Sequence, residues 1–197
     1  GMGFITANRA LCMLSVLINT HLLMAAKHNN VKQYFYSSSA CVYPDYRQED
    51  ANVTALKESD AYPAMPENGY GWEKLFSERL CKHYEEDFGM NVRVFRFHNV
   101  YGPHCEMSPE KSQVIPSLIR KAIRYPDEEF VVWGSGKQRR AFVFVSDIVD
   151  ALVAVATKGM NQGVIQIGPD YSTSIKEIAE RVCAISGKQI DIRFDTS

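Results

Sequence analysis

The sequence predicts an α/β fold built around a mainly parallel sheet, and two observations lead to that prediction. Short runs rich in Val, Ile, Phe and Tyr alternate with longer helical patterns along the whole chain, which is typical of βαβ units. Clusters of Gly, Pro and Asn separate these segments, as turn residues do. With 197 residues, 46% of them hydrophobic, the chain is long enough for one sizeable core, or for one domain and a second lobe.

The chain begins with two glycines that do not form a dinucleotide-binding loop. No strand precedes residues 1–5, and Thr6 stands where the pattern G-x-G-x-x-G needs its third glycine, so we expect a simple loop. Residues 8–27 then predict a helix that is apolar nearly all round, and therefore buried against a sheet and a second element. Polar residues interrupt its most apolar part, residues 11–26, which falls short of the roughly 20 apolar residues that span a bilayer.

A short strand and a long helix carry the residues on which the functional prediction rests. Residues 33–38 are rich in Tyr and Phe and predict a parallel strand buried on both faces, followed by a Ser/Ala/Cys turn at its carboxyl end. In open α/β sheets that end is where ligands bind. Residues 44–69 predict a long loop, residues 70–88 a helix that ends at Gly89, and residues 91–97 a strand.

The remainder of the chain predicts shorter elements. We expect a helix over 112–124, strands over 130–133 and 141–145, a helix over 147–157, a strand over 164–167, a helix over 174–185 and a last strand over 190–194. The composition changes near Pro103, from longer helices and buried strands to shorter elements with more turns. We therefore place a domain boundary there, with one unit over residues 1–102 and a smaller unit over residues 103–197.

Charge and cysteine content narrow the class of partner. The formal net charge of −1 gives no reason to expect nucleic acid or an anionic membrane as a partner. The five cysteines form no C-x-x-C pair and stand mostly in apolar or helical surroundings, so neither a disulfide framework nor a metal site is expected. No signal peptide is evident, and reduced thiols fit a cytoplasmic protein.

Three side chains form a candidate acid/base group. Tyr70 and Lys74 lie four residues apart on one predicted helix face, and Ser39 ends the predicted strand before them. A nearby ammonium favours the phenolate, so we expect Lys74 to lower the pKa of Tyr70 from its usual value near ~10. Ser39 can donate a hydrogen bond to the same substrate oxygen. Each motif alone is weak, because serine runs are usually loops and Tyr and Lys four apart occur by chance.

In this order and context, the three residues resemble the Ser-Tyr-Lys triad of the short-chain dehydrogenase/reductase superfamily. The resemblance implies part of a Rossmann-like doubly wound sheet over residues 1–102, with NAD as cofactor. It places Asn19, Ser37, Tyr70 and Lys74 at the cofactor. Asn19 is included because it matches the helix asparagine that the superfamily keeps beside the triad. The residues alone favour a structural amide inside a buried helix for Asn19, and that alternative stays open.

Longer motifs point to the extended branch of the superfamily, whose members act on nucleotide sugars. These are residues 37–43 (SSSACVY), residues 96–103 (RFHNVYGP), and WGSG at residues 133–136 followed by RAFV. Residue 41 is Cys where sugar 4-epimerases and related dehydratases usually carry Thr. Together with residues 1–5 (GMGFI) and 56–63 (LKESDAYP), this is similar to the GDP-mannose 3,5-epimerases along essentially the whole chain.

That resemblance implies a redox-neutral reaction. Hydride leaves C4 of the hexose for NAD, and the resulting ketone acidifies the C3 and C5 protons. A Cys/Lys pair removes these protons and returns them on opposite faces. The net reaction converts GDP-mannose into GDP-L-galactose. Cys41 and Lys111 take these two roles, since a Cys near cations and a crowded Lys can both act as bases at neutral pH. Without this setting, Cys41 would be interpreted as a merely buried thiol.

The same resemblance assigns contacts with the nucleotide sugar in residues 103–197, taken as mostly a substrate domain, and in the turns before it. The residues are Gly3, Ser39, Ala40, Cys41, Asn99, Glu110, Lys121, Gln138, Arg139 and Arg140. Planar guanidinium groups suit diphosphate oxygens, although Arg139 and Arg140 are individually also compatible with a solvated strand edge. Relatives commonly form homodimers through the helices represented here by residues 8–28 and 70–88.

The sequence departs from the family in its cofactor loop. The glycine-rich strand-turn-helix for the NAD pyrophosphate and the acidic residue for the ribose are both absent, so we expect a central fragment that holds the catalytic residues but lacks most of the cofactor site. An exposed sheet edge and exposed apolar helix faces would follow. Two alternatives remain open: another NAD-dependent nucleotide-sugar 4-epimerase or 4,6-dehydratase, and a catalytically inactive remnant that serves as an interaction module.

Overall fold

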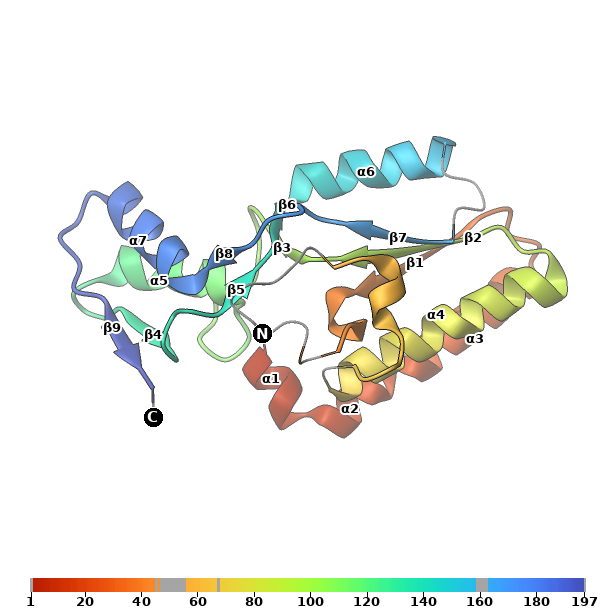
Figure 1. Ribbon diagram of the computed structural model, residues 1–197, viewed down its shortest axis with the longest axis horizontal. Coiled ribbons are helices and arrows are strands. Elements are labelled where there is room, and N and C mark those ends of the chain that lie inside the picture. Colours follow the sequence, from red (N-terminus) through yellow and green to blue (C-terminus); the bar gives the residue numbers. More distant parts are fainter. Residues whose placement is uncertain (1, 45, 47–55, 67, 159–162, 197) are drawn as a thin grey trace.

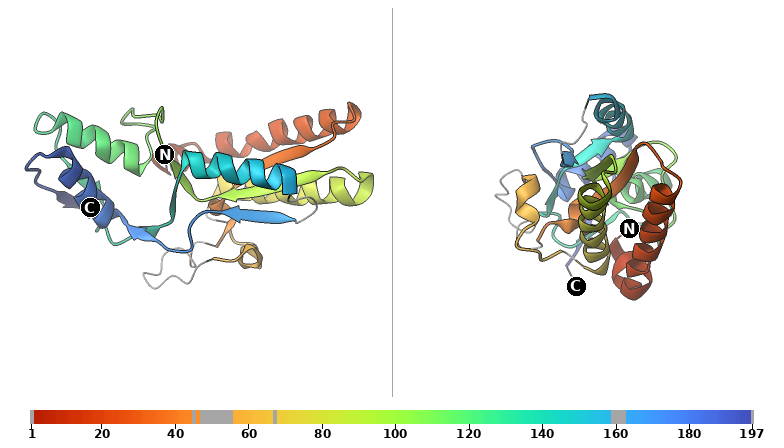
Figure 2. Two further views of the ribbon diagram at one scale, coloured as in Figure 1. Left: turned by 90° about the horizontal axis from the view of Figure 1, so that it is seen from above. Right: turned by 90° about the vertical axis from the view of Figure 1, so that its right-hand side faces the viewer.

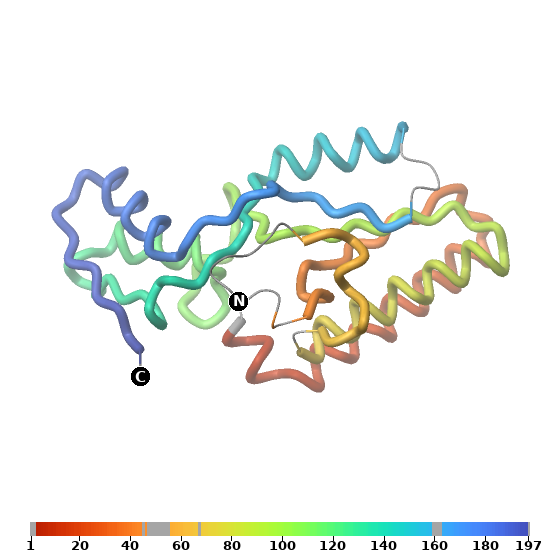
Figure 3. The backbone as a smooth tube through the Cα atoms, viewed as in Figure 1, coloured from red at the N-terminus to blue at the C-terminus, as the bar shows by residue number. Residues whose placement is uncertain are grey.

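A computed structural model describes residues 2–44, 46, 56–66, 68–158 and 163–196 (Figure 1). The molecule is elongated, with a three-stranded sheet and three long helices at one end and a small lobe of two helices and short strands at the other. Figure 3 traces the backbone from the first helices through the sheet to the small lobe, where the described chain ends.

The larger part is built on a parallel sheet with strand order β1-β2-β7, which confirms the predicted α/β class. The strands are β1 (Tyr34–Ser39), β2 (Val92–Phe97) and β7 (Val164–Ile167). In their register Ser39 lies beside Phe97, and Phe97 beside Ile167, so the three carboxyl ends meet at one edge. The predicted boundary at residue 102 stays a prediction, but β7 shows that the chain returns to the first sheet after entering the lobe.

Helices cover both faces of this sheet (Figures 1 and 2). They are α3 (Ser15–His28), α4 (Gly69–Phe88) and α6 (Val145–Lys158). Helices α3 and α4 lie side by side on one face, where Leu23 and Cys81 pack against Tyr36 of β1. Helix α6 lies on the opposite face, where Ile148 packs against Phe95. Burial of these side chains is the main stabilising term for this half of the molecule.

The small lobe has its own apolar core between two helices and two short strands. Its elements are α5 (Val114–Arg124), β4 (Val131–Trp133), α7 (Ile175–Ser186) and β9 (Arg193–Asp195), with β4 and β9 parallel. The buried residues are Leu118, Ala122, Phe130, Val132, Ile178 and Ala179. Two further strand pairs join the lobe to the sheet: β3 (Asn99–Tyr101) with β6 (Phe142–Phe144), and β5 (Arg139–Arg140) with β8 (Thr173–Ser174).

The prediction of a loop over residues 1–5 was wrong. Residues Met2–Ala7 form helix α1, and the Asn8 side chain donates a hydrogen bond of 2.9 Å to the Phe4 carbonyl, which completes its last turn. The long helix predicted over 8–27 is also divided, into α2 (Arg9–Met13) and α3. Side-chain hydrogen bonding by Asn8 to a carbonyl four residues earlier is a local effect that periodicity does not detect.

The expected burial of the apolar helix was wrong as well. Only Leu23 and Ala26 of α3 are buried, whereas Leu17, Ile18 and Leu22 are 52%, 62% and 56% exposed. The reason is that α3 packs on α4, and in the part of the chain that the structure describes no other long helix covers its outer side. Leu14 between α2 and α3 keeps helical backbone angles, and by length and composition the stretch Arg9–His28 could cross a bilayer, with a mean hydropathy of 1.5 and 11% of the window buried. By that measure, the expectation that this region falls short of a bilayer span was wrong.

Strand β1 is buried on one face only, which corrects the prediction of burial on both. Tyr36 and Ser38 are buried beneath α3 and α4, whereas Ser37 is exposed and Phe35 is 44% exposed. Helix α6 covers β2 and β7 on the other face, and among the described strands β1 pairs with β2 alone. As expected from the sequence, the sheet therefore ends in an exposed edge at β1.

Helix ends with strong local signals match the predictions. Helix α4 begins after Asn68, whose side-chain oxygen accepts from the backbone N–H of Tyr70 at 2.9 Å, and it ends at Gly89 with φ of 65°. Helix α7 begins after Ser174, which forms a capping box with Glu177. Both are standard N-cap and C-cap arrangements. Within the predicted loop 44–69, residues 58–61 form a short 3₁₀ helix η3, while residues 45, 47–55 and 67 lie outside the described part.

Candidate active site

The carboxyl end of β1 and the first turn of α4 form a tightly packed corner. The 3₁₀ turn η1 (Ala40–Val42) follows β1 directly and lies against α4. A side chain at Gly71 would collide with the carbonyl oxygen of Cys41 and would meet the Pro66 ring at 2.9 Å. Glycine at this position therefore allows the backbone of η1 to approach the helix, and it brings Cys41 next to the start of α4.

Ser39, Cys41 and Tyr70 meet in this corner. The Ser39 hydroxyl accepts a hydrogen bond of 3.2 Å from the Cys41 backbone N–H and forms a hydrogen bond with the Tyr70 side chain. Burial raises the pKa of Tyr70 to about 12, the Cys41 thiol adds to this increase, and the Ser39 hydrogen bond opposes it. The structure thus brings three of the predicted catalytic residues together.

The prediction that Lys74 lowers the pKa of Tyr70 was wrong for this structure. The Lys74 ammonium donates to the Ser37 carbonyl at 2.9 Å and lies 5.6 Å from the centre of the Tyr70 ring, rather than bonding to the phenol oxygen. Desolvation of the phenol therefore dominates over attraction by the ammonium. Ser37, predicted to contact the cofactor, contributes its carbonyl oxygen to hold Lys74.

Asn19 lies on α3, behind the helix turn that carries Lys74. Its amide nitrogen donates to Glu73 at 3.0 Å, and to Ser77 and the Tyr36 hydroxyl at 3.3 Å each. These contacts match the structural alternative that the sequence left open for Asn19. Its assignment to the cofactor stays a prediction.

A row of polar side chains crosses all three strands directly beneath the corner, and sequence reasoning did not predict it. Ser38, Arg96 and Gln166 occupy matching positions on β1, β2 and β7. Glu78 of α4 accepts two hydrogen bonds from the Arg96 guanidinium, at 2.9 and 2.6 Å, and a third from the Ser38 hydroxyl. Ser38, Glu78 and Arg96 are each at most 4% exposed, so this is a buried and hydrogen-bonded ion pair.

The same row holds the loops that follow β1. Arg96 also donates to the Tyr43 hydroxyl at 3.3 Å and to the Glu58 carbonyl at 2.7 Å. Tyr43 in turn donates to the Gln166 side chain, whose amide nitrogen bonds the Leu56 carbonyl at 2.9 Å. The segment after Cys41 and the segment around η3 are therefore both fixed to the sheet one residue below its carboxyl edge.

Ala40 belongs to this corner, whereas Gly3, Asn99, Glu110 and Lys111 lie on other segments of the chain. Gly3 is exposed on α1, and Ala40 is half-buried in η1. Glu110 and Lys111 are exposed in the turn between β3 and α5, where Lys111 contributes to lowering the pKa of Glu106. Asn99 opens β3, and its side chain donates to the Ala141 carbonyl at 3.1 Å.

The predicted substrate residues near the lobe are partly committed to other contacts. Arg139 donates to Ser172 at 3.1 and 2.6 Å and lies 3.5 Å from the Glu177 carboxylate, which favours the strand-edge alternative for this arginine. Arg140 donates to the backbone of Arg139 at 2.9 Å, and Gln138 is exposed. Lys121 donates to the Val131 carbonyl at 2.6 Å, beside an exposed Trp133.

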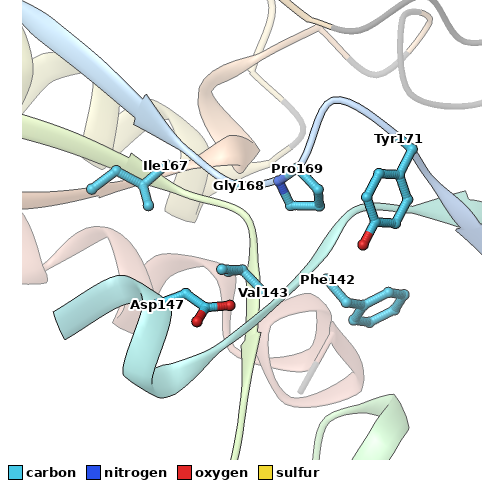
Figure 4. A pocket seen from close by; sticks show the side chains of 7 residues that line it. All are labelled: Phe142, Val143, Asp147, Ile167, Gly168, Pro169 and Tyr171. Carbon is cyan, nitrogen blue, oxygen red and sulfur yellow. The ribbon is translucent and has the colours of Figure 1, made fainter. Parts of the chain in front are cut away.

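A pocket of about 300 Å³ opens at the carboxyl end of β7, on the side of the sheet away from β1 in the strand order (Figure 4). It is lined by Phe142 and Val143 of β6, by Asp147 in the first turn of α6, and by Ile167 at the end of β7 with Gly168, Pro169 and Tyr171 after it. The predicted catalytic residues are not among these lining residues, so the chemistry points to the β1–α4 corner instead. Among the described residues, no group of three or more His, Cys, Asp or Glu could hold a metal ion.

Comparison with protein families and curated sequences gives consistent results. The model of the NAD dependent epimerase/dehydratase family matches residues 5–168. GDP-mannose 3,5-epimerase of Arabidopsis thaliana is 40% identical over 98% of this chain and 51% of that protein. GDP-mannose 3,5-epimerase 1 of Oryza sativa subsp. indica is 42% identical over 98% of the chain and 50% of that protein. The chain spans about half the length of the curated relatives it matches.

Solved structures share the fold. UDP-N-acetylglucosamine 4-epimerase from Methanobrevibacter ruminantium M1 superposes with a TM-score of 0.78 at 28% identity, over 90% of this chain and 54% of that one. A GDP-6-OMe-4-keto-L-xylo-heptose reductase from C. jejuni gives a TM-score of 0.84 at 24% identity, over 97% of this chain and 67% of that one. At that identity the second structure is evidence for the fold alone.

Proposed function

Because the chain belongs to the NAD dependent epimerase/dehydratase family, we propose that it carries the catalytic part of an enzyme that inverts C3 and C5 of GDP-mannose, giving GDP-L-galactose. One observation supports this specific reaction, in addition to membership of the family. Cys41 lies at the Ser39–Tyr70 corner, beside the residues that handle a sugar hydroxyl, in a chain 40–42% identical to GDP-mannose 3,5-epimerases over 98% of its length.

The corner fits the reactive end of NAD. A hydroxyl, a phenol and an ammonium gather at the carboxyl end of β1, where ligands bind in open α/β sheets. The 197 residues contain no G-x-G-x-x-G motif, so the corner residues would contact the nicotinamide end of NAD and not its pyrophosphate. NAD, when bound, supplies the hydride acceptor and returns the hydride at the end of the reaction.

The residues of the chain handle the protons. Tyr70 exchanges a proton with the C4 hydroxyl of the hexose, and Ser39 donates a hydrogen bond to the same oxygen. Once C4 is a ketone, its neighbouring C–H bonds are acidic, and Cys41 and Lys111 remove and return the protons at C3 and C5. Each proton removed is replaced by one delivered to the opposite face, so the substrate and product differ only in configuration.

The product distinguishes this proposal from other reactions of nucleotide sugars. We expect the full-length protein, incubated with NAD and GDP-mannose, to yield a GDP-hexose inverted at C3 and C5, identified by proton NMR coupling constants. Inversion at C4 alone would identify a 4-epimerase, and loss of water would identify a 4,6-dehydratase. Either result, or the return of unchanged GDP-mannose, would contradict the proposed function.

We also propose that the exposed apolar face of α3 and α4 forms a homodimer interface. Leu17, Ile18 and Leu22 of α3 lie exposed, as do Trp72 and Phe76 of α4 at 46% and 55%. A contiguous apolar surface of this kind favours association with another protein surface. Sedimentation analysis should give a dimer for the full-length protein and a monomer for Ile18→Arg, and a monomeric unsubstituted protein would contradict the proposal.

A further inference from the structure

Helix α4 carries a second buried carboxylate, Glu73, between Tyr70 and Lys74. Its side chain is 1% exposed, and one oxygen accepts the 3.0 Å hydrogen bond from Asn19. Its other oxygen is buried and has no hydrogen-bond partner among the described residues. The nearest cation is the Lys74 ammonium, 3.7 Å from that oxygen. A buried carboxylate with incomplete hydrogen bonding is destabilising, so its presence calls for an explanation.

Glu78, five residues further along the same helix, shows how this fold satisfies a carboxylate. Both of its oxygens are bonded by the Arg96 guanidinium, and Ser38 adds a further hydrogen bond. Glu73 is also buried but faces Asn19 of α3 instead of the sheet, and no guanidinium bonds it among the described residues. The two glutamates therefore differ in role: Glu78 is part of a closed structural network, whereas Glu73 is left with an oxygen directed toward Lys74.

The surroundings of Lys74 indicate what Glu73 does. The ammonium bonds the Ser37 carbonyl at 2.9 Å and lies 5.1 and 5.6 Å from the ring centres of Tyr36 and Tyr70. A lysine side chain has four rotatable bonds, so a neutral carbonyl and two rings alone constrain it weakly. The Glu73 carboxylate adds an attractive charge 3.7 Å from the ammonium.

We propose that Glu73 is a positioning residue, which holds the Lys74 ammonium between Tyr36 and Tyr70 and is itself fixed by Asn19. The proposal extends the proposed function, since Tyr70 and Lys74 serve there in proton exchange at C4. It also gives Asn19 a role: the amide does not contact Lys74 but fixes the carboxylate that does. The unpaired oxygen is then retained for the site, at the expense of stability.

The electrostatics of the cluster agree with this arrangement. Burial raises the pKa of Glu73, while Lys74 and Asn19 oppose the increase. Because the folded-state pKa lies above the unfolded one, the contribution of Glu73 to stability is fully present below the unfolded pKa and is lost as pH rises through the folded value. Tyr70 faces Cys41, Glu73 and Cys12, and all three raise its pKa; Tyr36 faces Glu73, Cys81 and Tyr70.

NMR of the Lys74 side chain tests the proposal without relying on enzyme activity. With ¹³Cε-labelled lysine in the full-length protein, and Lys74→Arg to assign the signal, we expect a Lys74 resonance shifted by the rings of Tyr36 and Tyr70. Glu73→Gln should move it to the position of exposed lysines, and Glu73→Asp should largely retain it. The matched control Glu78→Gln should leave it in place. An unmoved Lys74 signal in Glu73→Gln would overturn the proposal.

Stability and kinetics separate positioning from a purely structural role. Above the folded-state pKa of Glu73, we expect Glu73→Gln to melt at the same temperature as the unsubstituted protein or higher, while Glu78→Gln melts lower. In the epimerisation assay, Glu73→Gln should lower kcat at least tenfold with KM little changed. If the unsubstituted protein shows no epimerisation but Lys74 moves as expected, the proposed function fails and the positioning role stands. A lower melting temperature for Glu73→Gln than for the unsubstituted protein, measured above the folded-state pKa of Glu73, would contradict the positioning role.

Discussion

The β1–α4 corner and the turns over residues 99–140 carry the two halves of the predicted site, and they differ in how firmly the fold holds them. In the corner, Ser39 bonds the Cys41 backbone and Tyr70, and the Ser37 carbonyl holds Lys74. Across residues 99–140, Glu110, Lys111 and Gln138 are exposed in turns. In the proposed function, Ser39 and Tyr70 would act from a strand end and a helix, whereas Lys111 and part of the substrate contacts would act from exposed turns.

Buried polar contacts explain this difference. The corner stands on the row formed by Ser38, Arg96 and Gln166, which Glu78 closes from α4. Between residues 99 and 140 the corresponding contacts are less buried: Arg120 donates to Glu128 and to the Met107 carbonyl, with the two side chains 11% and 28% exposed, and Lys121 donates to a backbone carbonyl. The predictions below are ordered by expected effect, and each tests this contrast from one side or the other.

The largest effect is expected for Cys41. Removing a group that transfers a proton costs about 10²–10⁴-fold in rate, so Cys41→Ala should reduce GDP-mannose epimerisation by that factor. Because Cys41 packs at the surface of the corner and is not part of the polar row, thermal stability should change little. Initial rates measured by chromatography of the GDP-hexoses check this. Cys105→Ala, an exposed cysteine in the turn after β3, is the matched control and should keep full activity.

The next effect concerns the polar row. Removing one partner of a buried, hydrogen-bonded ion pair costs about 3–5 kcal/mol, because the other charge stays buried without its counterpart. Glu78→Gln should therefore lower the free energy of unfolding by about that amount, as measured by urea denaturation of the full-length protein. Glu86→Gln, on the exposed side of the same helix, is the control and should change little. Equal effects of the two substitutions would remove the structural basis of the contrast.

A smaller effect separates the two neighbouring arginines. Arg139 is held by Ser172 and lies 3.5 Å from the Glu177 carboxylate, so a diphosphate would have to compete with these contacts for its guanidinium. Arg140→Ala should weaken GDP-mannose binding by about 1.5–3 kcal/mol, the usual value of a charge-assisted hydrogen bond. Arg139→Ala should weaken it less. Calorimetric titration of both variants with GDP-mannose measures the two losses of affinity. A larger loss for Arg139→Ala than for Arg140→Ala would contradict this assignment.

The smallest effect is expected in the lobe. Ser174 caps α7 by accepting from the Glu177 N–H at 3.1 Å, and loss of such a cap typically costs about 1 kcal/mol. Ser174→Ala should therefore lower the free energy of unfolding by about that amount. The rates at the β1–α4 corner should remain unchanged, since β8 and α7 lie in the other part of the molecule. A large loss of activity would show that the two regions are more strongly coupled than the contacts indicate.

The sequence predicted those features of the fold that depend on local signals. Helices α4 and α7 were placed correctly because Asn68, Gly89 and Ser174 act within a few residues of the ends they define. The exposure of apolar helix faces was expected from the absent strands, but the pattern of α3 itself predicted burial, because apolar residues around a helix do not reveal how many neighbours it has. The return of β7 to the sheet was missed in the domain division, since strand pairing joins residues far apart in the chain.

The candidate site was predicted in a similar, uneven way. Ser39, Tyr70 and Lys74 were found because a strand end and a four-residue helical spacing place them together. The raised pKa of Tyr70 was not predicted, because the burial of its ring depends on tertiary packing at the corner, which a spacing of four residues does not reveal. The row through Arg96 was likewise invisible, since it requires the register of three strands.

The central claim is that proton exchange at C3 and C5 accompanies the reaction at the β1–α4 corner. It is tested most directly by incubating the full-length protein with NAD and GDP-mannose in deuterated water and locating deuterium in the recovered hexose by NMR. The account predicts deuterium at both C3 and C5, and its loss from at least one of them in Cys41→Ala. Deuterium at other carbons, or none at all in the active unsubstituted protein, would contradict it.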